Sequence, residues 1–472
     1  MPYLEGKRIH FAGAGGVSVS ALAEYALRSG AEVSCSDKRG SAVLSRLAAL
    51  GARVCEDDDA DIIEGCDLVV RSSAVPPDHP ALVRAAALGI PALERHEFLA
   101  RVAEEFDFVA AVAGTHGKTT VTSMIAHILR REGVPFVAHI GGRPVGMGGL
   151  VVNGGDMPRS LFLTEACEYG RHLTSLRPSL AVVTGMECDH PDCYRDISEV
   201  HAVFSEFLKD CPLAVLPEEC AFICSHEHID ICAPGHAGAG ESGGRGAVSG
   251  AEGRICAYTL TRTLGCGSVH SGVLSRCGRE CALSLPQPGA HMLTDAALAV
   301  AAACELGAGF ESACRALADF KGVERRLERA GSIEGVEVIF DYAHHPTEIA
   351  CTLDAVGPEG GILAVFQPHT YSRTAAYMDA FAEVLGRLGR VILMPVYAAR
   401  EQPGSGADSR DLARRITEKN PHCGVYYAEN ADEAYDLVKL FAPEYDVVLM
   451  LGAGDIYDMK ERFAPLTRCP EG

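Results

Sequence analysis

Three α/β domains in succession are predicted by this sequence, and three observations predict them. A chain of 472 residues holds about three domains at roughly 150 residues each. Short apolar runs of strand length alternate with helical patterns along most of the chain, which is typical of parallel sheets. Many of these runs end in glycines or polar residues, as strands do at the ligand-binding edge of a doubly wound sheet. The pattern favours Rossmann-like domains at both ends and a P-loop-type domain between them.

The composition limits the partners and the compartment of the protein. Apolar residues make up 48% of the chain and charged residues 22%, an ordinary balance for a globular protein. The net charge of −21 argues against a nucleic-acid-binding surface. No apolar run approaches the ~20 residues that span a bilayer, and Lys7-Arg8 lead directly into a strand, unlike a signal peptide. Nineteen cysteines without regular spacing favour reduced thiols. We therefore expect a cytoplasmic monomer or homodimer that binds small molecules and has no nucleic-acid or membrane partner.

The N-terminal domain opens with KRIHFAGAGG, a strand that runs into a glycine-rich turn, and a helix and a second strand follow. The turn contains Gly13, Gly15 and Gly16. Asp37 ends the second strand, where a carboxylate can meet a ribose hydroxyl. Ser73 follows a further strand at the same edge. This βαβ pattern predicts a nucleotide or nucleotide-sugar ligand, and a plain α/β turn is the alternative.

The central domain begins with FVAAVAGTHGKTTVTSMIAHI, which predicts a strand, a tight turn and a helix. Gly114 and Gly117 let the backbone curl so that its N–H groups face an anion. The helix adds the positive end of its dipole at the same place. Lys118 can reach the outer phosphates of a nucleotide, and the Thr119 hydroxyl can ligate the accompanying Mg²⁺. The stretch therefore predicts a phosphate-binding loop.

Val112 stands where the eight-residue form of this loop has glycine, so a chance strand–turn–helix is the alternative interpretation. Two later strands of the central domain also end in polar residues, one at Glu165 and the other shortly before His190. Mg²⁺ bridging phosphates usually takes one or two carboxylates. Glu165 is the predicted ligand, with His190 nearby, and the alternative for each is a polar strand end facing solvent.

Changes in composition set the expected domain limits. The first domain is expected over residues 1–105, the central domain over 106–323 and the last over 324–472. Residues 234–254, PGHAGAGESGGRGAVSGAEGR, contain almost nothing that can build a core. We expect this segment to be a flexible insert in the central domain.

The last domain again alternates strands and helices. Its strands lead into the polar sequences DYAHHP, QPHTYSR and GAGD. His344, His345 and His369 fall in two of these loops. A metal site is one interpretation, but contacts to a substrate are favoured because no Cys or acidic residue completes a ligand spacing.

Seven motifs together resemble the Mur ligase family, and they run through all three domains. They are AGTHGKTT at 113–120, TEACEYGRHL at 164–173, ECDHPDCY at 187–194, FKGVERRL at 320–327, FDYAHHPTE at 340–348, FQPHTYSRT at 366–374 and GAGDIY at 452–457. The resemblance implies ATP-dependent ligation of L-alanine to the lactyl carboxylate of UDP-N-acetylmuramate, through an acyl phosphate, in peptidoglycan precursor synthesis. A peptide-adding ligase of murein recycling and a weakened UDP-sugar-binding relative are the alternatives.

The resemblance also implies roles for particular residues. The implied catalytic residues are Lys118, Glu165, His190, Arg326 and His344. Contacts to ATP are implied for Gly114, Thr115, His116, Gly117, Lys118, Thr119, Thr120, His291, Asp295, Arg326 and Asp341. The implied UDP-sugar contacts are Gly13, Gly15, Gly16, Asp37 and Ser73. The incoming amino acid would meet His344, His369 and Arg373, and Mg²⁺ would meet Thr119, Glu165 and His190.

The sequence departs from the family pattern around the expected adenine site. The family usually has two asparagines after His291, where this chain has Met292 and Asp295. Gly185 replaces an asparagine that precedes the DH segment in the family. Asp295 can still accept a hydrogen bond from the adenine amino group. Because of these departures, a UDP-sugar-binding relative with weakened catalysis is one of the alternatives.

Overall fold

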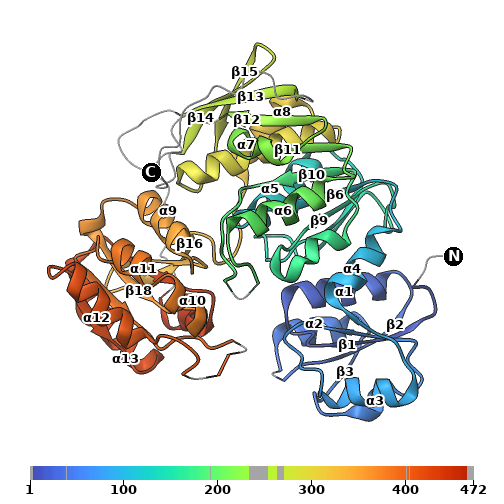
Figure 1. Cartoon of the computed structure of the whole chain (residues 1–472), viewed down its shortest axis with the longest axis horizontal. Helices are drawn as coiled ribbons and strands as arrows, with labels where there is room; N and C mark the ends of the chain where they lie inside the picture. The colour runs from blue at the N-terminus through green and yellow to red at the C-terminus, as the bar shows by residue number, and fades with distance from the viewer. Residues whose placement is uncertain are drawn as a thin grey trace.

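The computed structural model describes residues 4–464 except 39, 192, 233–253, 263–269, 400 and 403. The insert predicted over 234–254 therefore lies outside the described residues up to Arg254, where a strand begins. Three sheets divide the described chain, one in each domain (Figure 1). In this view the central domain lies above the other two, which confirms the predicted three-domain α/β architecture.

The first domain holds a five-stranded parallel sheet in the order β3-β2-β1-β4-β5, which is the Rossmann-like order. Its elements are β1 (Arg8–Ala12), α1 (Val17–Arg28), β2 (Glu32–Ser36), α2 (Ala42–Ala49), β3 (Arg53–Cys55), β4 (Leu68–Arg71), α3 (Pro80–Leu88), β5 (Ala92–Glu94) and α4 (Arg95–Ala103). The order reverses beside β1, so the turn after β1 lies at the crevice where such sheets bind ligands.

The central domain holds a ten-stranded mixed sheet in the order β15-β14-β13-β12-β11-β10-β6-β9-β7-β8. Its strands are β6 (Val109–Ala113), β7 (Phe136–His139), β8 (Leu150–Asn153), β9 (Phe162–Glu165), β10 (Leu180–Val183), β11 (Leu213–Pro217), β12 (His228–Cys232), β13 (Arg254–Arg262), β14 (Ser271–Arg276) and β15 (Arg279–Ser284). Its helices are α5 (Lys118–Arg131), α6 (Ile197–Leu208), α7 (Ala290–Glu305) and α8 (Phe310–Ala316). Because β6, β9 and β10 are parallel neighbours, their carboxyl ends meet at one edge.

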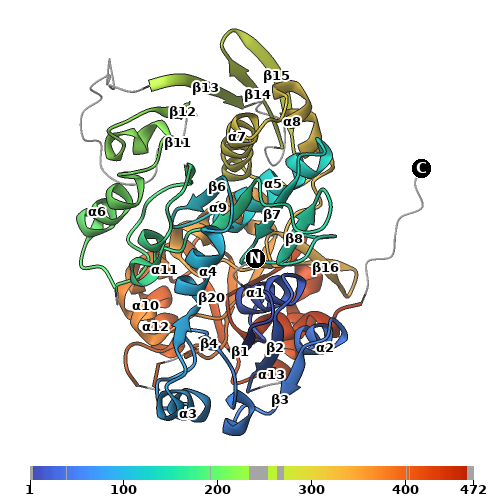
Figure 2. The ribbon, with the colours of Figure 1, turned by 90° about the vertical axis from the view of Figure 1, so that its right-hand side faces the viewer.

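The two faces of the central sheet are covered by different helices. Figure 2 shows α5, α7 and α8 on one side of this sheet and α6 on the other. The alternation of side chains along β6 explains this, since Ala110 and Val112 pack with α5 and α7 whereas Ala111 packs with α6. The alanine-rich run from Ala296 to Ala303 in α7 is fully buried and lets this helix pack closely against α5.

The last domain holds a six-stranded sheet in the order β16-β17-β21-β18-β19-β20, parallel except for β16. Its strands are β16 (Glu328–Ile333), β17 (Val336–Asp341), β18 (Ile362–Phe366), β19 (Arg390–Leu393), β20 (Gly424–Tyr427) and β21 (Val447–Leu451). Its helices are α9 (Pro346–Val356), α10 (Tyr371–Ala376), α11 (Met378–Leu385), α12 (Ser409–Lys419) and α13 (Ala431–Phe441). The loops after β17 and β18 face the central domain.

The two domain seams differ in chemistry. The first and central domains share one apolar cluster, in which the ring of Tyr25 from α1 lies against that of Phe106, with centroids 6.2 Å apart. The apolar clusters of the last domain contain no described residue of the central domain. The last domain meets the central domain through polar and charged side chains, described below. Seams of this kind are more readily opened and closed than apolar ones. Within the described residues, no helix is both long and apolar enough to cross a membrane.

Candidate active site

The predicted phosphate-binding loop is a tight turn between β6 and α5. Gly117 caps the helix with φ = 78°, a conformation that favours glycine. A Cβ at Gly117 would lie 2.8 Å from Asp295 Oδ1 of α7, so the loop and this carboxylate are in close proximity. At Gly114, a Cβ would overlap the Thr184 hydroxyl at the end of β10. The glycines are therefore required both by backbone conformation and by space.

Lys118, in the first turn of α5, forms a buried ion pair. Its Nζ lies 2.7 Å from Glu168 Oε2 and also donates to the carbonyl oxygens of Gly114 and Thr115. Burial lowers the pKa of Lys118, but the neighbouring acidic groups, Glu168 foremost, raise it further, so the pKa lies above its ordinary value. Glu168 was not among the predicted site residues. It lies three residues after Glu165 in the same motif.

Glu165 ends β9 beside the start of α5. Its Oε2 accepts a hydrogen bond from Thr119 Oγ1 at 3.0 Å, and its Oε1 accepts one from the Gly141 N–H at 2.6 Å. Burial raises the pKa of Glu165, while the Gly141 N–H and Lys118 oppose the rise. A hydroxyl and a carboxylate at the N-terminal end of a helix are hard oxygen ligands, which suit Mg²⁺. Thr119 and Glu165 therefore fit the predicted metal site.

His190, which the sequence predicts near Glu165, lies beside Glu168 and Asp189. Its Nε2 lies 3.8 Å from Glu168 Oε1 and 3.8 Å from Asp189 Oδ2. Burial lowers the pKa of His190, which favours a neutral imidazole. The described residues contain two clusters of three metal-ligating types, and neither includes Glu165 or His190. One is Glu94, His96 and His172, and the other is His116, Glu187 and His345.

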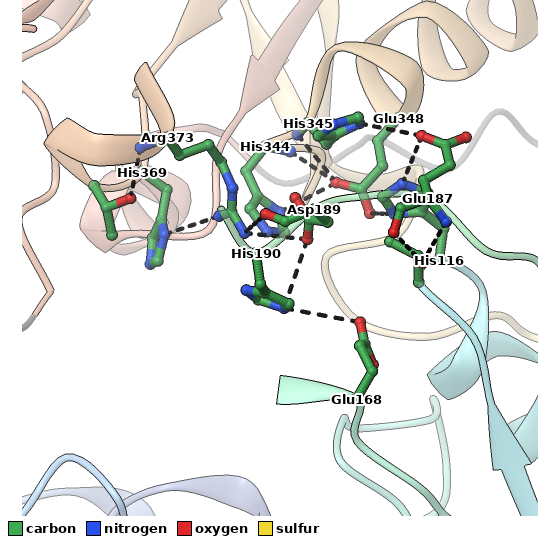
Figure 3. Close-up of polar contacts among 12 residues, drawn as sticks. His116, Glu168, Glu187, Asp189, His190, His344, His345, Glu348, His369 and Arg373 are labelled. Atoms are coloured by element: carbon green, nitrogen blue, oxygen red, sulfur yellow. Dashed lines mark hydrogen bonds and ion pairs between the residues drawn. The ribbon is translucent and has the colours of Figure 1, made fainter. Parts of the chain in front are cut away.

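Glu348 of α9 connects the phosphate-binding loop to the last domain (Figure 3). Its Oε1 lies 3.0 Å from His116 Nδ1 and 3.5 Å from Arg326 Nη1, and its Oε2 accepts the His344 N–H at 3.0 Å. Burial raises the pKa of Glu348, but His344 and His116 outweigh it and hold the pKa well below its usual range. For His116, burial alone would lower the pKa, but the neighbouring Glu348 and Glu187 raise it to about 10. Glu348 also completes the N-terminal capping box of α9. This capping pattern is the local sequence signal for the position of Glu348.

Further polar contacts join the central and last domains. Arg373 of α10 donates to Asp189 Oδ2 at 3.1 Å. The carboxylate of Glu187 accepts from Thr347 Oγ1 at 2.9 Å and lies 3.6 Å from His345 Nδ1. The vicinal histidines therefore have different neighbours, because His344 contacts Glu348 whereas His345 faces Glu187. Figure 3 shows these side chains converging from the two domains.

Asp341 and Asp295 are both predicted contacts of ATP on its adenosine side. Asp341 accepts the N–H groups of Leu327 and Ala343, both at 2.8 Å, and so holds the loop that carries Arg326. Burial raises the pKa of Asp295 to about 7, although Arg326 opposes the rise. His291 stands in the first turn of α7, one turn before Asp295.

The predicted UDP-sugar residues gather separately in the first domain. Asp37 Oδ2 accepts the Gly15 N–H at 2.8 Å, so the carboxylate closes the glycine-rich turn. Gly13, at φ = 77°, packs against Ser72, next to Ser73. Beside Asp37 lies a cavity of about 870 Å³ whose walls include Val54, Asp57 and His79.

The first domain contacts the central one through Ser18 and His139, whose Oγ and Nε2 are 2.9 Å apart.

Three α/β domains, with a glycine-rich strand–turn–helix loop in the central one, are the architecture of a nucleotide-dependent enzyme. The chain belongs to the Mur ligase family and is a ligase. Residues 8–107 match the model described as "Mur ligase family, catalytic domain" and residues 112–303 match "Mur ligase middle domain". Residues 325–454 match "Mur ligase, glutamate ligase domain".

Curated relatives match this chain along nearly its whole length. A protein of Acetivibrio thermocellus named UDP-N-acetylmuramate--L-alanine ligase is 34% identical over 465 residues, covering 97% of this chain and 95% of the relative. A protein of the same name from Salinibacter ruber is 36% identical over 475 residues, with 98% and 95% covered.

Two solved structures share the fold. The UDP-N-acetylmuramate-alanine ligase MurC of Thermotoga maritima superimposes with a TM-score of 0.76 at 24% identity, covering 97% of this chain and 98% of that one. A murein peptide ligase of Psychrobacter arcticus does so with a TM-score of 0.70 at 20% identity and the same coverage.

Proposed function

We propose that this protein uses ATP to ligate L-alanine to the lactyl carboxylate of UDP-N-acetylmuramate in peptidoglycan precursor synthesis. The observation that carries the proposal is its similarity to curated ligases of that name, at 34% and 36% identity across all three domains. The polar seam around the phosphate-binding loop supports it, because three ligands must meet where two domains can close on them. A cytoplasmic location, a monomeric or homodimeric state and domain limits at residues 105 and 323 remain predictions from the sequence.

The proposed ATP site lies on the loop between β6 and α5. Backbone N–H groups of residues 114–120 cradle the phosphates, and Lys118 and Arg326 offset the charge that develops on the transferred phosphoryl group. His116 joins this charged cluster through Glu348, which is also paired with Arg326. On the adenosine side the proposed contacts are His291, Asp295 and Asp341.

Mg²⁺ is the proposed metal, held by Thr119 and Glu165 with His190 nearby. The hydroxyl and the carboxylate already contact each other at the start of α5, as ligands of one small cation would. When bound there, Mg²⁺ supplies positive charge to the phosphates during transfer.

The proposed reaction has two steps. A lactyl carboxylate oxygen attacks the γ-phosphorus of ATP, the bond from that phosphorus to the β–γ bridging oxygen breaks, and ADP leaves an acyl phosphate. The alanine amine then attacks the carbonyl carbon, the bond to the phosphate oxygen breaks, and inorganic phosphate leaves with the electron pair. The nitrogen loses two protons in total from the ammonium form, and His344 or His369 is the proposed acceptor of one of them. Closure of the last domain on the other two excludes water from the acyl phosphate.

The first domain is the proposed UDP-sugar site, and the last domain carries the amino-acid site. Gly13, Gly15 and Gly16 would hold the pyrophosphate, with Asp37 and Ser73 beside the uridine. His344, His369 and Arg373 would meet the amino acid. His369 and His344 lie edge to face with centroids 5.5 Å apart, which supports one shared pocket.

A substrate-omission assay tests the proposal. The purified protein should release phosphate from ATP only when UDP-N-acetylmuramate and L-alanine are both present. A peptide that outcompetes L-alanine in the same assay would select the recycling ligase. UDP-sugar binding without ATP affinity in calorimetry would select a weakened relative.

A further inference from the structure

A cluster of three metal-ligating side chains joins the central domain to the last domain (Figure 3). His116 lies in the phosphate-binding loop, Glu187 in the loop after β10 and His345 at the N-cap of α9. One ligand atom of each residue lies within 4.8 Å of the other two. The three residues are far apart in the sequence, so the packing of the two domains brings them together.

The spacing of these atoms is close to that of a tetrahedral metal site. Glu187 Oε2 lies 3.5 Å from His116 Nε2 and 3.6 Å from His345 Nδ1. Zinc binds histidine nitrogen and carboxylate oxygen at about 2.0–2.2 Å, so two ligand atoms of a tetrahedral site lie about 3.4 Å apart. The observed distances are too long for good hydrogen bonds but almost right for ligands that share one ion.

The hydrogen bonds around the cluster favour a cation between the three side chains. His345 Nδ1 accepts the Thr347 N–H at 3.4 Å, and burial lowers the pKa of His345 to about 4, so this nitrogen carries a lone pair. The lone pair and the Glu187 carboxylate are both acceptors, and neither can donate a hydrogen to the other. Within the described residues, His116 Nε2 is buried and makes no hydrogen bond.

His116 also has the outer partner that metal-binding histidines usually have. A ligating imidazole almost always donates its second N–H to a carboxylate, a carbonyl oxygen or water. His116 Nδ1 lies 3.0 Å from Glu348 Oε1, and this contact orients the ring. Although burial opposes the change, Glu348 and Glu187 raise the pKa of His116 to about 10, so a metal ion must displace the proton on Nε2.

The second cluster, formed by Glu94, His96 and His172, has a different geometry. The rings of His96 and His172 are stacked, with centroids 3.8 Å apart and an angle of 7° between their planes. Imidazole lone pairs lie in the plane of the ring, so those of stacked rings run parallel and do not converge on one ion. The rings of His116 and His345 are tilted by 35°, with centroids 5.2 Å apart.

We infer that His116, Glu187 and His345 form a site for a transition-metal ion, Zn²⁺ foremost, that clamps the last domain on the central domain. Two imidazoles and one carboxylate suit Zn²⁺, whereas Mg²⁺ prefers oxygen ligands. The site is separate from the proposed Mg²⁺ site at Thr119 and Glu165. It adds a control to the proposed reaction, because a bound ion should slow the domain opening that releases products.

Co²⁺ is the probe for the site, because it replaces Zn²⁺ in tetrahedral sites and absorbs visible light there. In the metal-free, full-length wild type, one equivalent of Co²⁺ should give the visible bands of a tetrahedral nitrogen and oxygen site. The near-ultraviolet charge-transfer band of a thiolate site should be absent, which separates this site from cysteines. Added Zn²⁺ should remove the visible bands by displacing Co²⁺.

Two variants, one in each domain, remove a ligand with little other change. Glu187→Gln keeps an acceptor for Thr347 Oγ1, and His345→Asn keeps a side chain that can cap α9. Both should weaken Co²⁺ binding by about 100-fold or more, because loss of an outer partner alone costs about 10–100-fold. His96→Gln, in the second cluster, is the matched control and should bind Co²⁺ as the wild type does.

Circular dichroism of each variant identifies any loss of folding. The metal site is overturned if the wild type gives no tetrahedral bands, or if these bands persist in both Glu187→Gln and His345→Asn. It is also overturned if His96→Gln removes the bands.

Hydrogen exchange tests the clamp. An ion that binds only the closed arrangement stabilises it against opening. Zn²⁺ should therefore slow amide exchange in the first turn of α9 and in the loop after β10 in the wild type, but not in His345→Asn. Exchange that Zn²⁺ leaves unchanged in the wild type would overturn the clamp.

Turnover provides the last measurement. At saturating Mg²⁺ and ATP, Zn²⁺ should lower the kcat of phosphate release by the wild type, and His345→Asn should be about tenfold or more less sensitive. A wild-type kcat that Zn²⁺ does not change would overturn the effect on turnover. If the wild type releases no phosphate at all, the proposed ligase function fails, whereas the Co²⁺ spectra and hydrogen exchange still decide the metal site.

Discussion

Lys118 and Glu168 form a buried ion pair at the phosphate-binding loop, with Nζ and Oε2 2.7 Å apart and 50 positions between them in the sequence. Only 4% of the Glu168 side chain is exposed, so nothing but Lys118 and nearby donors compensates its charge. Lys118 is therefore both the proposed phosphate ligand and part of the folded framework.

Lys118→Ala should remove both roles together. We expect phosphate release to be lost and the free energy of unfolding to fall by about 3–5 kcal/mol, because Glu168 becomes an uncompensated buried charge. Urea unfolding and the phosphate-release assay measure the two effects. The double variant Lys118→Ala/Glu168→Gln separates them, since it should recover most of the stability and none of the activity. Full activity in either variant would remove Lys118 from the mechanism.

Asp295 should make ATP binding depend on pH. Burial raises its pKa to about 7, so the carboxyl is largely neutral below pH 7 and charged above it. Because this carboxylate lies against Gly117, its charge opposes the phosphates, and the KM for ATP should rise roughly tenfold between pH 6 and pH 9.

Asp295→Asn is the matched variant for that dependence. It keeps the shape and a hydrogen-bonding carbonyl but never acquires the charge. We expect the ratio of wild-type to variant KM for ATP to be near one at pH 6 and to increase with pH. Because both proteins meet the same ATP, this ratio also cancels the effect of the titration of ATP itself. A ratio that stays constant across the range would contradict the prediction.

Gly15→Ala should affect the UDP-sugar alone. A Cβ at this position would lie 2.8 Å from Asp37 Oδ2, so the carboxylate must move and its hydrogen bond to the Gly15 N–H is lost. We expect the KM for UDP-N-acetylmuramate to rise about tenfold while the KM for ATP changes less than about twofold. Gly360→Ala is the control, because a Cβ there would meet no atom within 4 Å. An equal rise in both constants would argue against a separate UDP-sugar site.

His139 should make the folded state sensitive to acid. Burial lowers its pKa from 6.5 to about 3, and Ser18 of the first domain contacts its Nε2 at 2.9 Å. Below pH 6.5 the unfolded chain binds a proton at this residue, whereas the folded chain does not. The contribution of His139 to the free energy of unfolding is therefore fully present above pH 6.5 and falls as the pH decreases. One such group contributes a slope of about 1.4 kcal/mol per pH unit.

His139→Gln tests this contribution. The thermal midpoint should fall less steeply between pH 6.5 and pH 4.5 in the variant than in the wild type. His10 contributes a similar but smaller pH dependence of stability in both proteins, since burial lowers its pKa to about 4. Identical slopes would exclude His139 as the group responsible.

Local sequence was sufficient to predict the parts of the site that depend on neighbouring residues. The loop between β6 and α5 was predicted because two glycines, a lysine and a helical pattern follow an apolar strand. The glycine turn before α1 was predicted in the same way. The Rossmann-like strand order of the first domain follows from the alternation of strands and helices, which permits few other connections. The last sheet has a different order, with β21 inserted between β17 and β18. The β11–β15 extension of the central sheet was not predicted.

The partners of the charged groups could not be predicted. Glu348 contacts His116 across 232 positions, and Arg373 contacts Asp189 across 184. The sequence did not indicate that Glu165 and His190 would have different neighbours. Each of these contacts depends on how one domain packs on another.

The sequence by itself determined the order of the three domains, the strand ends that carry polar residues and the two glycine-rich turns. These features depend on backbone conformation and side-chain periodicity, which residues within one or two turns of the chain decide. Only the tertiary structure decided that Lys118 is paired with Glu168, that Glu348 joins the loop to Arg326 and that Asp189 faces Arg373. Charges act through space, and the distance between two domains is set by their packing, which no short stretch of sequence contains.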